Sequence, residues 1–246
     1  MKTFVFRAGG SLKAALCCAV ALALVGFTAA FACDSLFLPP KQAFCASNGR
    51  SLPIYSVQTS EKKAAIGINC AWDDRDILPM LSTLQQNGVH ATFFLCGYRV
   101  EQYPALAARI AQEGHEIGNH SNRHEFFTHM SAEAVCADLH KAEETISAAT
   151  GQTPRLLRPP GGLYDPDVLA SSVCAEAPVV LWSIDPEDWR DRPVDTVVNF
   201  VTRRAGNGDI ILLHDMHVSS VEAALRIIDT LEARGFTFVM VSELAL

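Results

Sequence analysis

His120 and His124 stand four residues apart, a spacing at which two imidazoles can reach one metal ion from a helical turn or a loop. Far upstream, Asp73 and Asp74 could supply a carboxylate that completes a set of three ligands, leaving positions open for water and substrate. A second carboxylate beside the metal could accept a proton from that water. Taken alone, these segments are also consistent with solvated loop histidines and with an acidic turn that caps a helix.

Segment 158–162, Arg-Pro-Pro-Gly-Gly, has the composition of a ligand-binding turn. Its prolines stiffen the chain, and its glycines allow the backbone to approach a ligand closely. Arg158 could orient a catalytic carboxylate through two parallel hydrogen bonds. The same segment would also suit a plain tight turn that carries a surface arginine.

Two acid–base candidates follow apolar runs further along the chain. His214 ends a wholly apolar run, a partly desolvated position that suits a general acid or a buried structural histidine. Asp188 could hold a histidine in one tautomer, and Trp189 beside it offers a flat face to a sugar, whereas Trp182 is expected in the core. Four other histidines lack supporting partners and are expected to be structural or surface residues: His115, His129, His140 and His217.

The apolar patterns alternate between strand and helix. Strands are expected over residues 64–69, 90–95, 116–119, 156–158, 178–184, 209–214 and 236–241. Helices are expected over residues 77–86, 104–112, 131–149, 165–174, 194–205 and 219–234, with Ser131 as an N-cap and Gly151 as a helix end. About seven β-α units predict a barrel or an open doubly wound sheet, and both place their sites at the carboxyl ends of the strands.

Composition favours one large exported domain. The 246 residues are 49% hydrophobic and 19% charged, the balance of a folded chain, and the net charge of −7 makes nucleic acid an unexpected partner. Residues 1–32 combine basic residues, an apolar run and an Ala-Phe-Ala end, which predicts a signal peptide or an uncleaved membrane anchor. Lipidation of Cys33 is a third alternative. Residues 33–63 are expected to be an N-terminal extension or linker, and residues 64–246 the catalytic domain.

Six cysteines follow the targeting segment, without the Cys-x-x-Cys spacing of a four-cysteine zinc site. Export permits a disulfide, and Cys33 with Cys45 is the first pair to test. Cys70 and Cys96 fall at the ends of predicted strands, where a buried thiol behaves as a small hydrophobic group.

The five polar segments, taken in order with Ala91-Thr92-Phe93-Phe94 and the stretch 114–121, resemble the polysaccharide deacetylase family, which shares the NodB homology domain. The resemblance covers roughly residues 64–244. It implies a distorted (β/α)7-type barrel as a single catalytic domain. It also implies a divalent metal, most often zinc, and removal of acetyl groups from glycans such as chitin or peptidoglycan.

Carried over residue by residue, the resemblance implies a role for each motif. It makes His120 and His124 the metal histidines and His214 the general acid. Asp188 tunes that histidine, Arg158 orients the base, and the backbone near Gly161 forms part of an oxyanion hole. Separately from the resemblance, the flat face of Trp189 makes it the expected substrate-binding aromatic. Matching acid to acid makes Asp73 the catalytic base and Asp74 the third metal ligand.

The first motif departs from the family pattern Thr-Phe-Asp-Asp-Gly. Matching its distance to Ala91 instead places Asn69 at the base position, the Asn-x-Ala-Trp form of some spore-associated members. Asn69 cannot accept a proton, whereas Asp74 lies near the metal in both registers. Gly161 also replaces an aromatic residue common in the third motif.

Three functions follow from these expectations. The first is metal-dependent deacetylation of an N-acetylated sugar polymer outside the cytoplasm. The second is a glycan-binding envelope protein that kept the fold and lost the base. The third is a metal-dependent deacylase or amidase that acts on a non-polymeric substrate.

Overall fold

The computed structural model describes residues 52–71, 77–171, 174, 176–215 and 217–245, which belong to the second of the two units of the chain, residues 41–246. At its centre is a parallel sheet of five strands: β1 (Lys63–Cys70), β2 (Thr92–Leu95), β3 (Glu116–Asn119), β4 (Asp209–His214) and β5 (Thr237–Val239). Strand β1 pairs with β4 along one edge, and along the other it pairs first with β5 and then with β2, which pairs with β3.

Single-residue bridges continue this sheet around a ring. Leu157 bridges Asn119 of β3 to Val179, and Ile184 bridges to Ile211 of β4. Of the two architectures that the element pattern allowed, the distorted α/β barrel that the resemblance implied is therefore present. The predicted strands 156–158 and 178–184 are reduced to bridges, because prolines next to them lack the N–H groups that a longer ladder would need.

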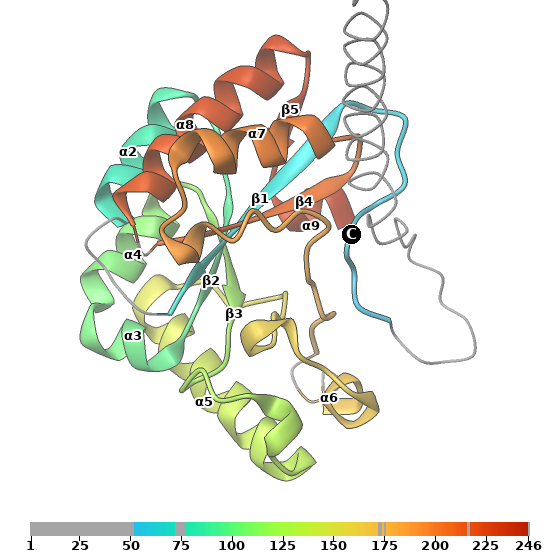
Figure 1. The fold of residues 1–246 in the computed structure, drawn as a ribbon. Coiled ribbons are helices and arrows are strands. Elements are labelled where there is room, and N and C mark those ends of the chain that lie inside the picture. Colours follow the sequence, from blue (N-terminus) through green and yellow to red (C-terminus); the bar gives the residue numbers. More distant parts are fainter. Residues whose placement is uncertain (1–51, 72–76, 172–173, 175, 216, 246) are drawn as a thin grey trace, which may run out of the picture. The chain divides into compact units, whose positions relative to one another are not determined.

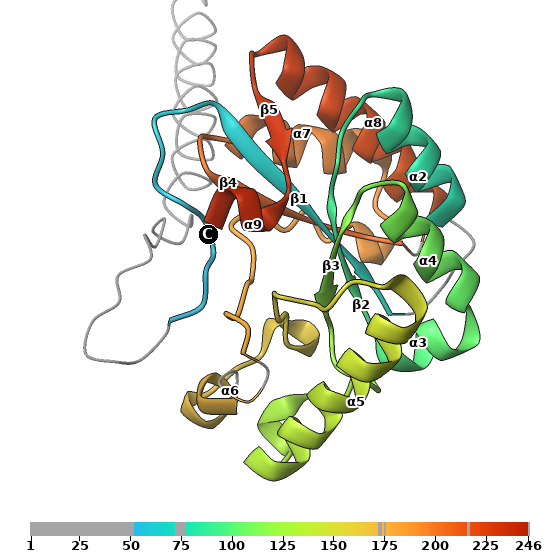
Figure 2. The same cartoon turned by 180° about the vertical axis from the view of Figure 1, so that it is seen from behind.

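Helices cover the outside of the strands (Figures 1 and 2). Helix α7 packs on α8, α8 packs on α2, and α3 and α4 pack on α5. The helices are α2 (Ile77–Gln86), α3 (Gly97–Gln102), α4 (Pro104–Gln112), α5 (Ala132–Thr150), α6 (Pro166–Ser171), α7 (Val194–Arg204), α8 (Val218–Ala233) and α9 (Val241–Ala245), with short 3-10 turns η1 (Phe127–His129), η2 (Pro160–Gly162) and η3 (Asp188–Arg190). The predicted caps of α5 are confirmed, since the Ser131 side chain accepts from the Ala134 N–H and Gly151 takes a left-handed conformation.

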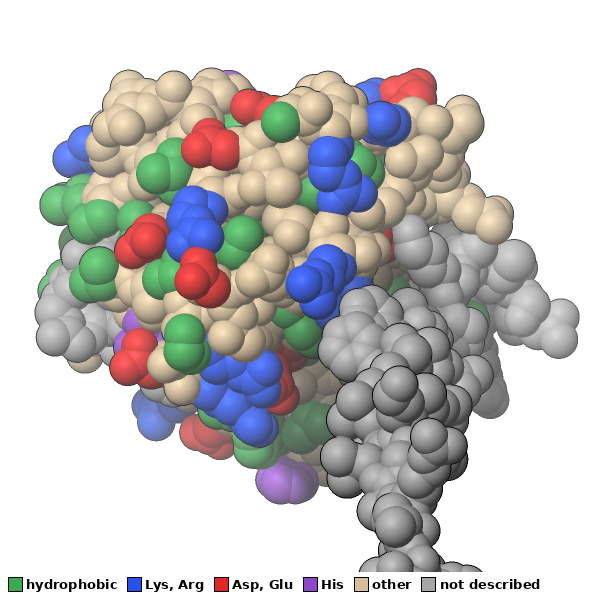
Figure 3. Space-filling model, turned by 45° about the horizontal axis from the view of Figure 1, so that its top comes forward, with side chains coloured by type: hydrophobic (Ala, Val, Ile, Leu, Met, Phe, Trp, Pro, Cys, Tyr) green, Lys and Arg blue, Asp and Glu red, His purple; other side chains and the backbone are tan. Residues whose placement is uncertain are grey.

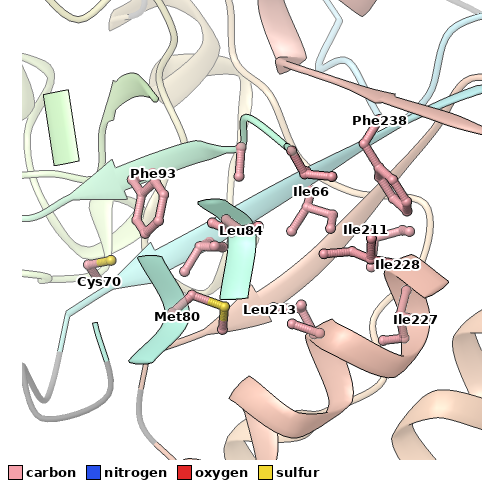
Figure 4. Close-up of a cluster of buried hydrophobic side chains, with 14 of the residues drawn as sticks. Ile66, Cys70, Met80, Leu84, Phe93, Ile211, Leu213, Ile227, Ile228 and Phe238 are labelled. Carbon is pink, nitrogen blue, oxygen red and sulfur yellow. The ribbon is translucent and has the colours of Figure 1, made fainter. Parts of the chain in front are cut away.

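The main core lies between the sheet and the helices (Figure 4). Alternate residues of β1 point to this layer, as Ile66 does, where they meet Met80 and Leu84 of α2 and Ile227 of α8. Ala65, one residue away, belongs instead to a second buried cluster with other strand residues. This alternation fixes which strand residues can reach the interior of the barrel.

Residues of the predicted extension pack onto the domain. The Ile54 N–H donates to the Val179 carbonyl, and the Leu181 N–H donates to the Ile54 carbonyl, each at 2.8 Å. The predicted targeting segment and the proposed Cys33–Cys45 pair lie outside the described residues. Within the described part of the chain, no helix is both long and apolar enough to cross a bilayer.

One disulfide, which the sequence did not predict, joins Cys136 of α5 to Cys174. Cys70 and Cys96 are free and buried, as predicted. Burial raises the pKa of the Cys70 and Cys96 thiols, so both favour the protonated form. On the face drawn in Figure 3, Lys and Arg side chains are interspersed with Asp and Glu.

His115 is a buried structural histidine, and it predicts a pH-dependent loss of stability. Its Nδ1 accepts the Ala91 N–H at 3.2 Å, and its pKa is lowered to about 4, chiefly by burial and then by His90. The unfolded chain therefore binds a proton below about pH 6.5, whereas the folded chain does so only near pH 4.

The free energy of unfolding should thus decrease as the pH falls through this window, and His115 should account for about 1–2 kcal/mol of the decrease. A His115→Asn variant, whose side-chain oxygen can accept the same hydrogen bond, should lose that part of the pH dependence. Urea unfolding of both proteins at about pH 7 and pH 4.5 measures the difference, in which the titrating groups that do not interact with His115 cancel. Equal pH dependence in the two proteins would contradict the assignment.

Candidate functional site

The polar residues predicted from the sequence meet at one end of the strands. Asn69 of β1 is the register partner of His214 in β4 and of Phe94 in β2. His120 follows the last residue of β3, and Arg158 follows the bridge residue Leu157. In a parallel sheet these carboxyl ends lie at a common edge, which brings the separate motifs together.

The two histidines are positioned by a turn with unusual backbone angles. Ser121 and His124 have φ values of 71° and 59°, a left-handed conformation that non-glycine residues adopt at a cost of about 1–3 kcal/mol. Hydrogen bonds offset this cost: the Ser121 N–H donates to the Asn119 side chain, and the His124 N–H donates to the Ser121 hydroxyl. The turn brings the two imidazole rings to 5.0 Å between their centroids.

His120 has the environment of a metal ligand. Its ring is fully buried, and Nδ1 lies 2.6 Å from the Arg158 carbonyl oxygen, so Nδ1 carries the proton and donates. Its Nε2 is buried and has no hydrogen-bond partner among the described residues. A metal-binding histidine usually donates one ring N–H to an acceptor such as a backbone carbonyl, and its other ring nitrogen binds the metal.

Electrostatics keep both imidazoles neutral, the form that binds a metal. Burial and the neighbouring His124 hold the pKa of His120 well below its usual value. Burial and then His214 lower the pKa of His124. Within the described residues no cluster of three ligands is complete, because the predicted ligand Asp74 and the predicted base Asp73 lie outside them.

His214 and Asp188 form a buried acid–base pair. His214 Nδ1 lies 2.8 Å from Asp188 Oδ1, and the backbone N–H of His214 donates to Asp188 Oδ2 at 2.8 Å. The hydroxyl of Ser220, in the first turns of α8, also donates to Oδ2. Three donors thus hold the Asp188 carboxylate in place. The carboxylate in turn holds the His214 imidazole through Nδ1, and Nε2 is the other ring nitrogen. Sequence reasoning missed Ser220, because no motif includes this residue, which lies six residues beyond His214.

Arg158 is a buried cation in the interior of the barrel. Its guanidinium donates to the carbonyls of Gly67, Val180 and Leu181, and burial lowers its pKa to about 9. The Phe94 ring lies against it at 3.7 Å. Gly67 provides the necessary space, because a Cβ atom there would lie 2.5 Å from Nη2 of Arg158.

The side-chain partner of Arg158 is Asn69. Nη1 of Arg158 donates to Oδ1 of Asn69 at 2.9 Å, and within the described part of the chain the guanidinium makes no salt bridge. The arginine expected to orient a catalytic base therefore contacts an amide. Of the two registers of the first motif, this contact favours the one that puts Asn69 at the base position.

The two predicted substrate-binding residues lie on turns near these groups. Gly161, in η2, has φ 63°, and Trp189, in η3, directly follows Asp188. The Trp189 side chain is 41% exposed, with Arg190 over its ring at 4.7 Å. Trp182 is partly buried and packs against two hydrophobic clusters, consistent with its expected core position.

Comparison with known proteins assigns the chain to a family. Residues 57–179 match the model of the polysaccharide deacetylase family. Peptidoglycan-N-acetylglucosamine deacetylase of Bacillus cereus is 36% identical over 195 residues, which are 77% of this chain and 91% of that protein. Peptidoglycan-N-acetylmuramic acid deacetylase PdaC of Bacillus subtilis is 40% identical over 166 residues, 67% of this chain but only 35% of PdaC.

Solved structures of the same family share the fold. A pseudoenzyme of carbohydrate esterase family 4 from Bacillus anthracis has a TM-score of 0.76 at 30% identity, over 78% of this chain and 68% of its own. A mutant of that pseudoenzyme is described as having restored enzymatic activity. The structure of PdaC has a TM-score of 0.70 at 34% identity, over 76% of this chain and 92% of that one. Together with the motifs assembled at the strand ends, these matches show that the chain belongs to the polysaccharide deacetylase family.

Proposed function

We propose that this protein is a metal-dependent hydrolase that removes acetyl groups from N-acetylated glycans such as peptidoglycan or chitin-like polymers. The observation that carries the proposal is the convergence of the His120–His124 pair, the His214–Asp188 pair and Arg158 at one end of the strands. The activities of the B. cereus and B. subtilis relatives support it.

The metal ligands in this proposal are His120, His124 and Asp74. The buried Nε2 of His120 fits a divalent cation, and zinc suits a set of two imidazoles and one carboxylate. Such an ion would polarise the acetyl carbonyl and lower the pKa of a water molecule toward about 7. The backbone near Gly161 is proposed as part of the oxyanion hole.

His214 is the proposed general acid. Asp188 accepts a hydrogen bond from Nδ1 of His214, and Nε2 is the ring nitrogen proposed to deliver the proton. The group that receives it is the sugar nitrogen, which departs as a free amine when acetate forms. Trp189, exposed beside Asp188, is the proposed contact for a sugar ring.

The site has an unusual residue at the position expected for the catalytic base. Arg158 orients Asn69, and an amide cannot accept a proton. Asp73 is therefore the proposed base, and we propose that deacetylation by the natural sequence is slow.

The contact between Arg158 and Asn69 also favours a second candidate function, a glycan-binding envelope protein without turnover. The likeness to the family 4 pseudoenzyme supports this candidate too. Either function requires a chain exported to the cell wall.

Acetate release from N-acetylglucosamine oligomers tests the proposal. The zinc-supplemented protein should release acetate faster than a His120→Ala variant, which lacks a proposed metal ligand. Equal release by the two proteins would refute hydrolysis at this site. Oligomer binding without any release would instead support the second candidate.

A further inference from the structure

An exposed aromatic side chain lies beside the site and has no role so far. Phe126 follows His124 by two residues and directly precedes η1, with 42% of its surface exposed. Its neighbour Phe127 is only 1% exposed and packs in a hydrophobic cluster with Leu139 and Val168. The fold thus uses one phenylalanine of the pair for its core and leaves the other at the surface.

Phe126 is held against the 158–162 turn. A Cβ atom built on Gly161 would lie 3.0 Å from Cε1 of Phe126 and 3.7 Å from Cγ of Leu163. The ring and the leucine therefore approach the same point, and Leu163 is itself 45% exposed. On its other side the Phe126 ring contacts the His129 ring edge to face at 5.9 Å.

These contacts make a small apolar surface of defined orientation. One edge of the ring is fixed by η1 and another by the backbone of Gly161, so little side-chain freedom remains to be lost on binding. The surface adjoins two motifs of the site, through His124 on one segment and Gly161 on the other.

We propose that Phe126 and Leu163 form a platform for a sugar ring next to the residue held in the site. The apolar C–H face of a pyranose ring can stack on an aromatic face, while its hydroxyl groups stay in water. Trp189 belongs to a different segment, so the platform would be a contact separate from the one proposed for Trp189. This inference rests on the proposed function and specifies where its polymeric substrate binds.

Binding of tetra-N-acetylchitotetraose, measured by calorimetry with zinc-supplemented protein, tests the platform. A Phe126→Ala variant should bind the tetramer about 10-fold more weakly than the natural protein, which corresponds to about 1.4 kcal/mol. A Phe126→Trp variant should restore most of the affinity. Affinity for the monosaccharide N-acetylglucosamine should not change. Leu225→Ala is the matched control, since it removes an exposed apolar side chain from α8.

The outcomes separate this inference from the proposed function. Equal tetramer affinity in Phe126→Ala and the natural protein would overturn the platform alone. A natural protein that binds neither ligand would overturn the proposed function and the platform together. Loss of monosaccharide and tetramer affinity to the same degree would also overturn the platform, because it would indicate a general disturbance of the site.

Discussion

Replacement of Asn69 with aspartate is expected to raise the rate of acetate release from N-acetylglucosamine oligomers about 100-fold or more. The substitution exchanges an amide for a carboxylate of nearly the same shape, and Arg158 already donates to the oxygen at this position from 2.9 Å. A positioned general base contributes about 10²–10⁴ to a rate, so supplying one where none is oriented should recover much of that factor.

The measurement is acetate release by the purified natural protein and Asn69→Asp under the same zinc supply. Asn207→Asp is the matched control, because it makes the same chemical change at a surface amide, whose side chain donates a hydrogen bond to the Ser60 carbonyl. Adding His120→Ala to Asn69→Asp should abolish the gain. An unchanged rate in Asn69→Asp would mean that Asp73 already serves as an effective base, and our account of the slow step would be wrong.

The contact between Arg158 and Asn69 also explains why this point could not be decided from the sequence. Two registers of the first motif differ by four residues, and the spacing of motifs is compatible with both. The choice depends on which strand residue faces the barrel interior, and that is set by the pairing of Asn69 with His214 and Phe94. Strand pairing is a long-range property that no local pattern encodes.

Other parts of the site were predictable because their signals are local. The resemblance to the family implied that Asp188 tunes His214, and both residues lie beside apolar runs, which end at a common edge of a parallel sheet. Their hydrogen bond at 2.8 Å confirms this expectation. By contrast, the Cys136–Cys174 disulfide links residues 38 apart, and only the packing of α5 brings the two Cα atoms to 5.9 Å.

Phe126 shows the same limit at the surface. Adjacent phenylalanines have equal hydrophobicity, so the sequence does not tell which of Phe126 and Phe127 is buried. The answer depends on the left-handed turn at His124 and on the absence of a side chain at Gly161. The glycine that replaces a common family aromatic thus leaves space that an aromatic residue from another segment occupies.

A test of the metal site does not depend on turnover. His120→Ala and His124→Ala should each weaken zinc binding at least about 100-fold, because removal of a direct ligand exceeds the 10–100-fold effect typical of the residues behind it. Competition with a chromophoric chelator measures the affinity. His140→Ala is the control, since His140 is an exposed histidine of α5.

Two variants are needed because the two histidines differ in burial. His120 is fully buried and is hydrogen-bonded to the Arg158 carbonyl, so its loss could also disturb the turn. His124 is only half-buried, and its variant should keep the natural thermal stability while losing zinc. If both variants bound zinc as tightly as the natural protein does, the ion would have to bind elsewhere. The orphaned Nε2 of His120 would then mark a buried structural histidine, and metal-dependent hydrolysis at this end of the barrel would have no basis.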